Sequence, residues 1–146
     1  MGKSMNAKPE AANLKKKILV VDDNEIVVKT TSMKLQGAGY DVVTALDGAD
    51  GVASVRKEKP DLILLDINFP PDVTSVPWDG FRIIEWLNRV DETKKIPIII
   101  ISGVLDEKNK QRAINSGAVA FFPKPVNYDE MLKTIRATLS NPLVEK

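Results

Sequence analysis

The sequence predicts an α/β fold in which a doubly wound, five-stranded parallel sheet carries helices on both faces. Three short, continuous runs of branched apolar residues lead to this prediction, at 18–21, 62–65 and 98–101. Such runs are typical of strands that helices cover on both faces. Segments with helical spacing alternate with the runs, which implies right-handed crossovers. Five such units favour the strand order 2-1-3-4-5, with a ligand crevice at the carboxyl ends of the strands.

The remaining elements are predicted from weaker signals. Two more strands are expected at 41–44 and 118–122, which are shorter or less continuously apolar. The helices expected between the strands span about 24–36, 47–58, 80–90, 107–116 and 127–139. Gly37 and Gly117 stop two of these helices, and Asn127 with Glu130 resembles a capping box at the start of the last.

Apolar residues at helical spacing indicate one face of each helix. The residues expected on these faces are Ile26, Thr30 and Met33 in the first helix, Ala49, Val52 and Ala53 in the second, Ile83, Leu87 and Val90 in the third, Ala113 and Ile114 in the fourth, and Tyr128, Met131, Leu132, Ile135 and Leu139 in the fifth.

Composition narrows the possible chemistry. The chain has 146 residues, enough for one domain with a substantial core, and a formal charge of +1 gives no reason to expect a nucleic-acid partner. It contains neither cysteine nor histidine, so thiolate chemistry, a disulfide framework and histidine ligands are excluded. The apolar runs are too short to span a bilayer and the N-terminus lacks a signal-peptide pattern, so we expect a cytoplasmic protein.

Polar residues follow four of the predicted strands. Asp22-Asp23 follow the first, Asp66 ends the third, Ser102 ends the fourth, and Lys124-Pro125 follow the fifth. Because the carboxyl ends of parallel strands share one edge of the sheet, these side chains should converge. A strand-terminal Asp is by itself more often a helix cap, as we expect for Asp47 and Asp106.

Three carboxylates in one pocket require a compensating cation. Two unit charges 4 Å apart repel by about 4 kcal/mol at an effective dielectric constant near 20. An all-oxygen ligand set favours a hard ion, with Mg²⁺ the usual case. Asp66 can then act as a nucleophile toward phosphorus, while Lys124 and Ser102 stabilise charge on the phosphoryl oxygens.

Taken together and in this order, these residues resemble the receiver domains of two-component response regulators, of the single-domain, chemotaxis-like type with a flavodoxin-like fold. The resemblance covers residues 17–140, which leaves 1–16 as an expected flexible arm and 141–146 as a tail. It implies that Asp66 is the phospho-acceptor. The chain would catalyse its own phosphorylation and dephosphorylation, and would not be an enzyme that acts on other substrates. A separate sensor histidine kinase or histidine phosphotransfer protein would be the donor.

The resemblance also implies individual roles around the acceptor. Asp23 would bind Mg²⁺ directly, Asp22 through water, and the main-chain carbonyl of Asn68 would be a further ligand beside Asp66. Lys124 would contact the phosphoryl group.

Three other residues would form the moving parts. Pro125 would follow a cis peptide bond, and Ser102 and Phe121 would be the switch pair, although an aromatic residue at a strand end is more often part of the core. Output would come from contacts with a downstream protein, and the phosphorylated form could dimerise. One departure from the family pattern is a longer segment between Pro70 and Asp79 beside the site.

Two other functions remain as alternatives, and two more are disfavoured. A pseudo-receiver that signals by constitutive contacts fits the same fold. An aspartyl-phosphate hydrolase would want an acid two residues after the nucleophile, where this chain has Asn68, which cannot act as a general acid or base. A nucleotide-binding module would need a phosphate-binding loop after the first strand. This chain has Asp22 and Asp23 there, and their carboxylates would repel the phosphate of a nucleotide. DNA binding would need a further domain, for which the segments outside 17–140 are too short.

Overall fold

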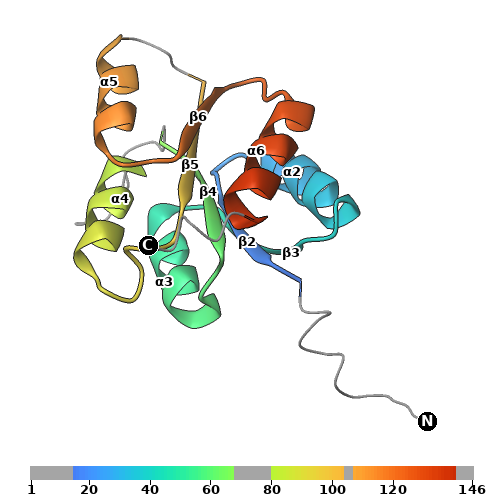
Figure 1. Ribbon diagram of the computed structural model, residues 1–146, viewed down its shortest axis with the longest axis horizontal. Helices are drawn as coiled ribbons and strands as arrows, with labels where there is room; N and C mark the ends of the chain where they lie inside the picture. Colours follow the sequence, from blue (N-terminus) through green and yellow to red (C-terminus); the bar gives the residue numbers. More distant parts are fainter. Residues whose placement is uncertain (1–14, 68–79, 104–106, 141–146) are drawn as a thin grey trace.

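Five parallel strands form one sheet in the order β3-β2-β4-β5-β6 (Figure 1). The computed structural model describes residues 15–67, 80–103 and 107–140. The strands are β2 (Lys17–Val21), β3 (Asp41–Ala45), β4 (Leu62–Asp66), β5 (Ile98–Ser102) and β6 (Ala120–Pro123). Counted along the chain, this order is 2-1-3-4-5, so the predicted topology is confirmed. All four pairings are parallel.

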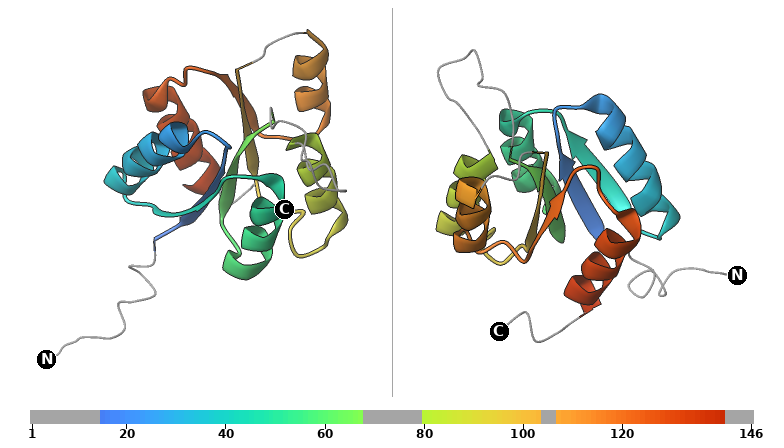
Figure 2. Two further views of the ribbon diagram at one scale, coloured as in Figure 1. Left: turned by 180° about the vertical axis from the view of Figure 1, so that it is seen from behind. Right: turned by 90° about the horizontal axis from the view of Figure 1, so that it is seen from above.

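Five helices connect the strands and cover both faces of the sheet (Figure 2). They are α2 (Glu25–Gly37), α3 (Gly48–Glu58), α4 (Gly80–Arg89), α5 (Glu107–Asn115) and α6 (Tyr128–Ser140). On one face, α2 and α6 pack Leu35, Met131 and Ile135 against the strands. On the other face, α3, α4 and α5 pack around a second apolar cluster that includes Val55 and Leu87. Within the described ranges, none of these helices has the length and apolarity needed to cross a membrane.

Side chains that precede the helices bind the backbone N–H groups left without partners in the first turn. Asn24 Oδ1 accepts from the amides of Ile26 and Val27 at 2.9 and 3.2 Å. Asp47 Oδ1 accepts from the Asp50 amide at 2.7 Å, so the predicted cap at Asp47 is confirmed. Such caps typically stabilise a helix by about 1 kcal/mol.

The expected cap at the last helix is also present. Asn127 Oδ1 accepts from the Glu130 amide at 3.1 Å, which gives one half of the predicted capping box. Asp106, the other expected cap, lies outside the described residues.

The prediction for the first helix placed the wrong face toward the sheet. Ile26 and Met33 are 76% and 63% exposed, and Thr30 is exposed as well. The buried residues of α2 are Val28, Thr31 and Leu35. Apolar side chains occur on both sides of this helix, so spacing alone did not distinguish the packed face.

Two other predicted faces need correction in part. In α3 the buried residues are Gly48, Gly51 and Val55, whereas Ala49 and Ala53 are exposed. Glycines bring this helix close to the sheet, and a search for apolar side chains overlooks them. In α5, Ala113 is buried as expected but Ile114 is 62% exposed. The predicted faces of α4 and α6 lie partly or fully buried, with Ile83, Leu87, Met131 and Ile135 at their centres.

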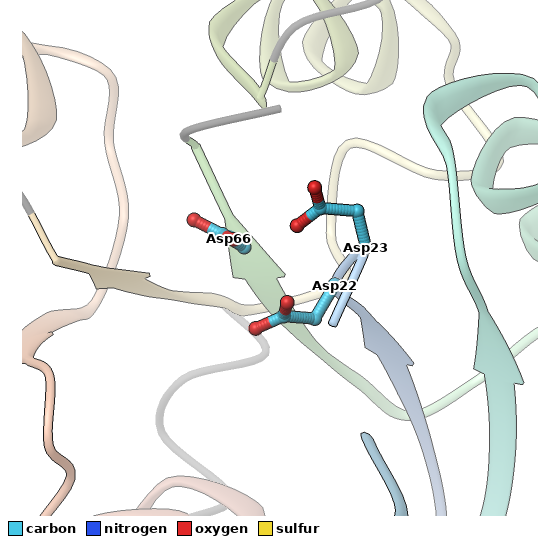
Figure 3. Close-up of side chains that lie close together, drawn as sticks. All are labelled: Asp22, Asp23 and Asp66. Atoms are coloured by element: carbon cyan, nitrogen blue, oxygen red, sulfur yellow. The ribbon is translucent and has the colours of Figure 1, made fainter. Parts of the chain in front are cut away.

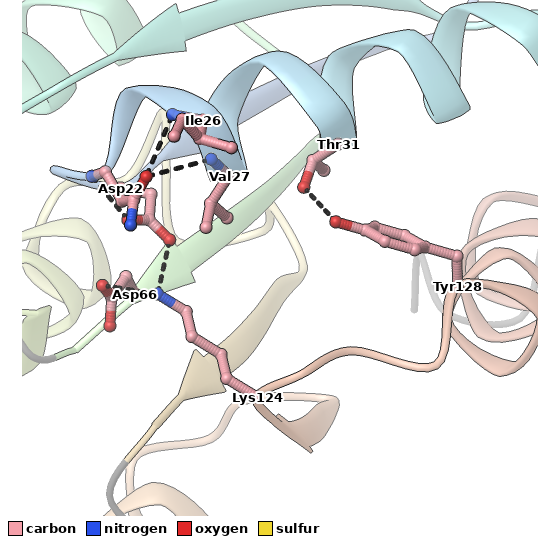
Figure 4. A network of polar contacts seen from close by, with 8 residues as sticks. Asp22, Ile26, Val27, Thr31, Asp66, Lys124 and Tyr128 are labelled. Carbon is pink, nitrogen blue, oxygen red and sulfur yellow. Dashed lines mark hydrogen bonds and ion pairs between the residues drawn. The ribbon is translucent and has the colours of Figure 1, made fainter.

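A buried polar contact joins the two helices on one face of the sheet. Thr31 Oγ1 of α2 and the Tyr128 hydroxyl of α6 lie 3.0 Å apart (Figure 4). Thr31 is only 2% exposed, so this hydroxyl needs the partner that Tyr128 supplies. The contact connects two helices that are 97 residues apart in the chain and fixes the position of α2 beside α6.

Candidate functional site

Three carboxylates converge at the carboxyl edge of the sheet (Figure 3). Asp22 and Asp23 follow β2 and Asp66 ends β4, and one oxygen from each lies within 4.8 Å of the others. The strand register explains this convergence, because Val21 pairs with Leu65 and the next residues are therefore level with each other. Asp22 and Asp66 are each 3% exposed, whereas Asp23 is exposed to solvent.

A single ammonium group bridges the two buried carboxylates (Figure 4). Lys124, which follows β6, donates from Nζ to Asp22 Oδ2 at 2.7 Å and to Asp66 Oδ2 at 3.1 Å. The Lys124 amide also donates to the Ser102 carbonyl at 2.9 Å, which fixes the backbone of Lys124 to the end of β5. Residues from β2, β4, β5 and β6 thus meet at one point.

The surroundings of Lys124 keep it charged. Burial alone would lower the pKa of this ammonium, but the hydrogen bond to Asp22 and the Coulombic attraction of Asp66 and Asp22 outweigh the burial. The pKa of Lys124 is therefore raised above its ordinary value. A lysine with a raised pKa is protonated throughout the neutral range, so it supplies a permanent positive charge to the pocket.

The Asp22 carboxylate is held by the chain at both of its oxygens. Oδ2 accepts from Lys124, and Oδ1 accepts from the Asn24 amide at 2.9 Å. Asn24 is also the N-cap of α2, so the start of the helix and the position of Asp22 are set by the same short turn. Asn24 was not among the site residues predicted from the sequence. A residue of this type between an acidic pair and a helical pattern is the signal that would have found it.

The other predicted site residues lie near this cluster or outside the described ranges. Ser102 ends β5 and is fully buried, and the peptide bond between Lys124 and Pro125 is cis. Phe121 of β6 is half-buried and packs against the apolar cluster under α3, α4 and α5. The roles of Ser102 and Phe121 as a switch stay predictions. Asn68 and the long segment from Pro70 to Asp79 lie outside the described residues.

The residues present fit a divalent cation with a preference for oxygen. Among the residues that the structure describes, three carboxylates face the Lys124 ammonium, which leaves a formal excess of two negative charges. Its ligand atoms are all oxygens, as a hard ion such as Mg²⁺ requires. The exposed Asp23 gives access from solvent, whereas the buried Asp22 and Asp66 form the inner wall.

Sequence comparison assigns the class of protein that this fold and site define. The family model described as the response regulator receiver domain matches residues 18–136, from the first strand into the last helix. The chain belongs to this family.

Individual relatives are consistent with the family. The chain is 36% identical over 124 residues to protein PilH of Pseudomonas aeruginosa, an alignment that covers 85% of this chain and 98% of PilH. It is 35% identical over 123 residues to the DNA-binding dual master transcriptional regulator RpaA of Synechocystis, with 84% of this chain but only 48% of RpaA aligned. Among solved structures, a CheY-like receiver domain protein of Methanospirillum hungatei superposes with a TM-score of 0.77, 28% identity, and coverage of 87% of this chain and 95% of that one.

Proposed function

We propose that the chain is a phosphorylation-controlled response regulator in which Asp66 accepts a phosphoryl group. The observation that carries this proposal is the Lys124 ammonium, which lies 3.1 Å from Asp66 Oδ2 among acidic side chains from neighbouring strands. The family match supports the same reading. A buried carboxylate at the mouth of an open α/β sheet, with a fixed cation beside it, is suited to attack on phosphorus.

The proposed step moves one phosphoryl group. An oxygen of the Asp66 carboxylate forms a bond to phosphorus, and the bond from phosphorus to the donor's imidazole nitrogen breaks. The electron pair of that bond stays on the nitrogen. Lys124 is placed to donate to the phosphoryl oxygens, and the Ser102 hydroxyl is a second donor at the same edge of the sheet. We propose that the chain catalyses this step on itself and acts on no separate substrate.

Mg²⁺ is the cofactor that we propose for this site. Asp22, Asp23 and Asp66 would hold it, and when bound it would neutralise charge on the transferring group. The chain's own contribution is to keep Asp22 fixed by Asn24 and Lys124 and to leave Asp23 accessible. Because the excess of carboxylates over ammonium groups is two, a divalent ion brings the cluster to neutrality.

The partners we propose are proteins. Because this chain has no histidine, a separate sensor histidine kinase or histidine phosphotransfer protein would supply the phosphoryl group. We propose that this transfer takes place in the cytoplasm. The exposed side chains of Ile26 and Met33 on α2, with Leu46 after β3, line a surface groove and suit contact with such a donor. A downstream protein would recognise the phosphorylated form, and neither nucleic acid nor membrane is a proposed partner.

Intact mass measurement tests the central step. The protein would be incubated with acetyl phosphate and Mg²⁺, and compared with Asp66→Asn and with a sample containing a chelator. We expect one added phosphoryl group on the wild type, and none on the variant or without metal. A folded, Mg²⁺-binding wild type that gains no mass would favour either rapid loss of the phosphoryl group or a pseudo-receiver. Phosphate release from acetyl phosphate separates the two, because only rapid turnover would produce it.

A further inference from the structure

Gly80, the first residue of α4, lies directly against the backbone next to the proposed phospho-acceptor. A Cβ atom built at Gly80 would overlap the Cα atom of Ile67, and it would lie 2.7 Å from Ile67 Cγ2 and 2.8 Å from Ile67 Cβ. Carbon atoms in packed proteins are separated by about 3.5–4.0 Å. Because Ile67 follows Asp66 in the chain, the absent side chain of Gly80 leaves room for the backbone that carries the acceptor.

This overlap cannot be relieved by rotating a side chain. The nearest atom belongs to the main chain, and Ile67 is only 5% exposed. Ile67 packs in the cluster that also contains Phe81 and Ile84 of α4, and its amide donates to the Ile101 carbonyl of β5 at 3.4 Å. A methyl group at position 80 therefore requires a shift of about 1 Å between α4 and the end of β4 to restore normal contact.

A second glycine shows a milder form of the same packing. A Cβ at Gly51 of α3 would lie 3.2 Å from Cγ1 of Val21, the residue before Asp22. Here the neighbour is a side chain, which can move by a few tenths of an ångström. By contrast, a Cβ at Gly37, at the end of α2, would meet nothing within 4 Å. The three glycines thus form a graded series, from backbone overlap to open space.

We propose that Gly80 is a positioning residue for Asp66: its missing side chain lets α4 fix the backbone after the acceptor so that Asp66 meets Lys124 and the other carboxylates. The proposal rests on the proposed function of Asp66. The start of α4 was not among the site features predicted from the sequence. A displacement of about 1 Å at a reacting group is enough to slow a positioned reaction by up to about a hundredfold.

The test compares alanine at the three glycine positions. Labelling by acetyl phosphate would be followed by intact mass. In a separate titration, the shifts of the Asp66 and Ile67 amides would give the affinity for Mg²⁺. We expect Gly80→Ala to slow labelling by at least tenfold and to weaken Mg²⁺ binding. Gly51→Ala should have a smaller effect, and Gly37→Ala should label at the wild-type rate.

A stability control separates positioning from simple loss of structure. Ile135→Val removes a methyl group from the opposite face of the sheet, in the cluster under α2 and α6. It should lower the melting temperature without changing the labelling rate. If Gly80→Ala labels at the wild-type rate with unchanged Mg²⁺ affinity, or is slowed no more than variants of equal melting temperature, the proposal is wrong.

Two further comparisons cover the cases in which Gly80→Ala does not fold or the wild type is not labelled. Should Gly80→Ala fail to fold in dilute buffer, the same comparison would be made in a stabilising osmolyte, with Ile135→Val under the same conditions. Gly80→Ala should then fold and label more slowly than Ile135→Val, and equal rates, or failure to fold even there, would overturn the proposal. If the wild type accepts no phosphoryl group, the proposed function fails. The Gly80 proposal is then decided by Mg²⁺ affinity and by the amide shifts of Asp66.

Discussion

At the scale of single residues, the pocket is arranged around one lysine. Lys124 is the cation in contact with two carboxylates that are nearly inaccessible to water, and its side chain is itself only 23% exposed. Breaking a buried ion pair by removing one partner is strongly destabilising, because the remaining charge stays buried without compensation. Lys124 therefore contributes to folding when no metal is bound, as well as to the chemistry proposed for it.

Lys124→Met should lower the free energy of unfolding by about 3 kcal/mol in the presence of a chelator. Mg²⁺ should restore part of this loss, because it neutralises the same carboxylates. Urea denaturation with and without Mg²⁺ measures both effects. Lys94→Met is the matched control, since its ion pair with Asp91 is exposed and should contribute less than about 1 kcal/mol. Equal losses in the two variants would contradict the structural role of Lys124.

The raised pKa of Lys124 fixes how this difference depends on pH. A cation whose pKa is higher in the folded than in the unfolded state stabilises the fold fully below the unfolded value. For lysine the unfolded value is about 10.4. The stability difference between wild type and Lys124→Met should therefore be constant from neutral pH to about pH 10, and should shrink as the pH rises through the raised pKa of Lys124.

At the scale of elements, α2 presents an apolar surface on both sides. Leu35 is fully buried against the sheet, whereas Met33 is 63% exposed on the opposite side. Leu35→Ala should lower the free energy of unfolding by about 2–5 kcal/mol, and Met33→Ala by less than about 0.5 kcal/mol. Thermal or urea denaturation measures both. Comparable losses would place Met33 in the core.

Because Met33→Ala should leave the fold intact, slower transfer to this variant from a phosphohistidine protein would report on donor binding.

The strands were easier to predict than the helix faces for a physical reason. In β4 and β5 every residue is buried and the first four residues of each strand are apolar, so the pattern admits one interpretation. In α2, both the packed and the exposed faces carry apolar residues, and in α3 two of the packed positions are glycines. Helical spacing alone cannot show which face packs in such cases.

The convergence of the site could be predicted, but its contacts could not. Parallel topology places the ends of β2, β4, β5 and β6 at one edge, so the order of elements was enough to bring Asp22, Asp66 and Lys124 together. The bridging of both carboxylates by one ammonium depends on distances of a few ångströms. The packing of Gly80 on Ile67 depends on how the first residue of α4 lies against the residue after β4, which no local pattern encodes.

At the scale of the whole molecule, the site and the second apolar cluster are connected through β5 and β6. Ser102 ends β5 at the site, and Phe121 of β6 pairs with Ile100 and packs against the cluster under α3, α4 and α5. We propose that phosphorylation shifts a pre-existing equilibrium that moves Ser102, Phe121 and the face formed by α5, β6 and α6. This would be the surface that a downstream protein, or a second copy of the chain, recognises.

Backbone amide spectra test this switch. Addition of a beryllofluoride mimic of the phosphoryl group should shift the amides of Ser102, Phe121 and the α5, β6 and α6 elements. The amides of α3, which also borders the cluster but lies away from this face, should change less. Asp66→Asn treated with the same mimic is the control and should show no shifts. Spectra that change only at residues adjacent to Asp66 would argue against a switch that reaches the far side of the sheet.

The order in which the chain is synthesised gives the Lys124 bridge a further consequence. Lys124 comes 102 residues after Asp22 and 58 residues after Asp66. At a ribosomal rate of about 5–20 residues per second, the growing chain contains all three carboxylates for about 3–12 s before their lysine is added. During that interval Lys124, the lysine that bridges Asp22 and Asp66, is not yet part of the chain. The charge balance of the acidic edge of the sheet depends on one of the last strands to leave the ribosome.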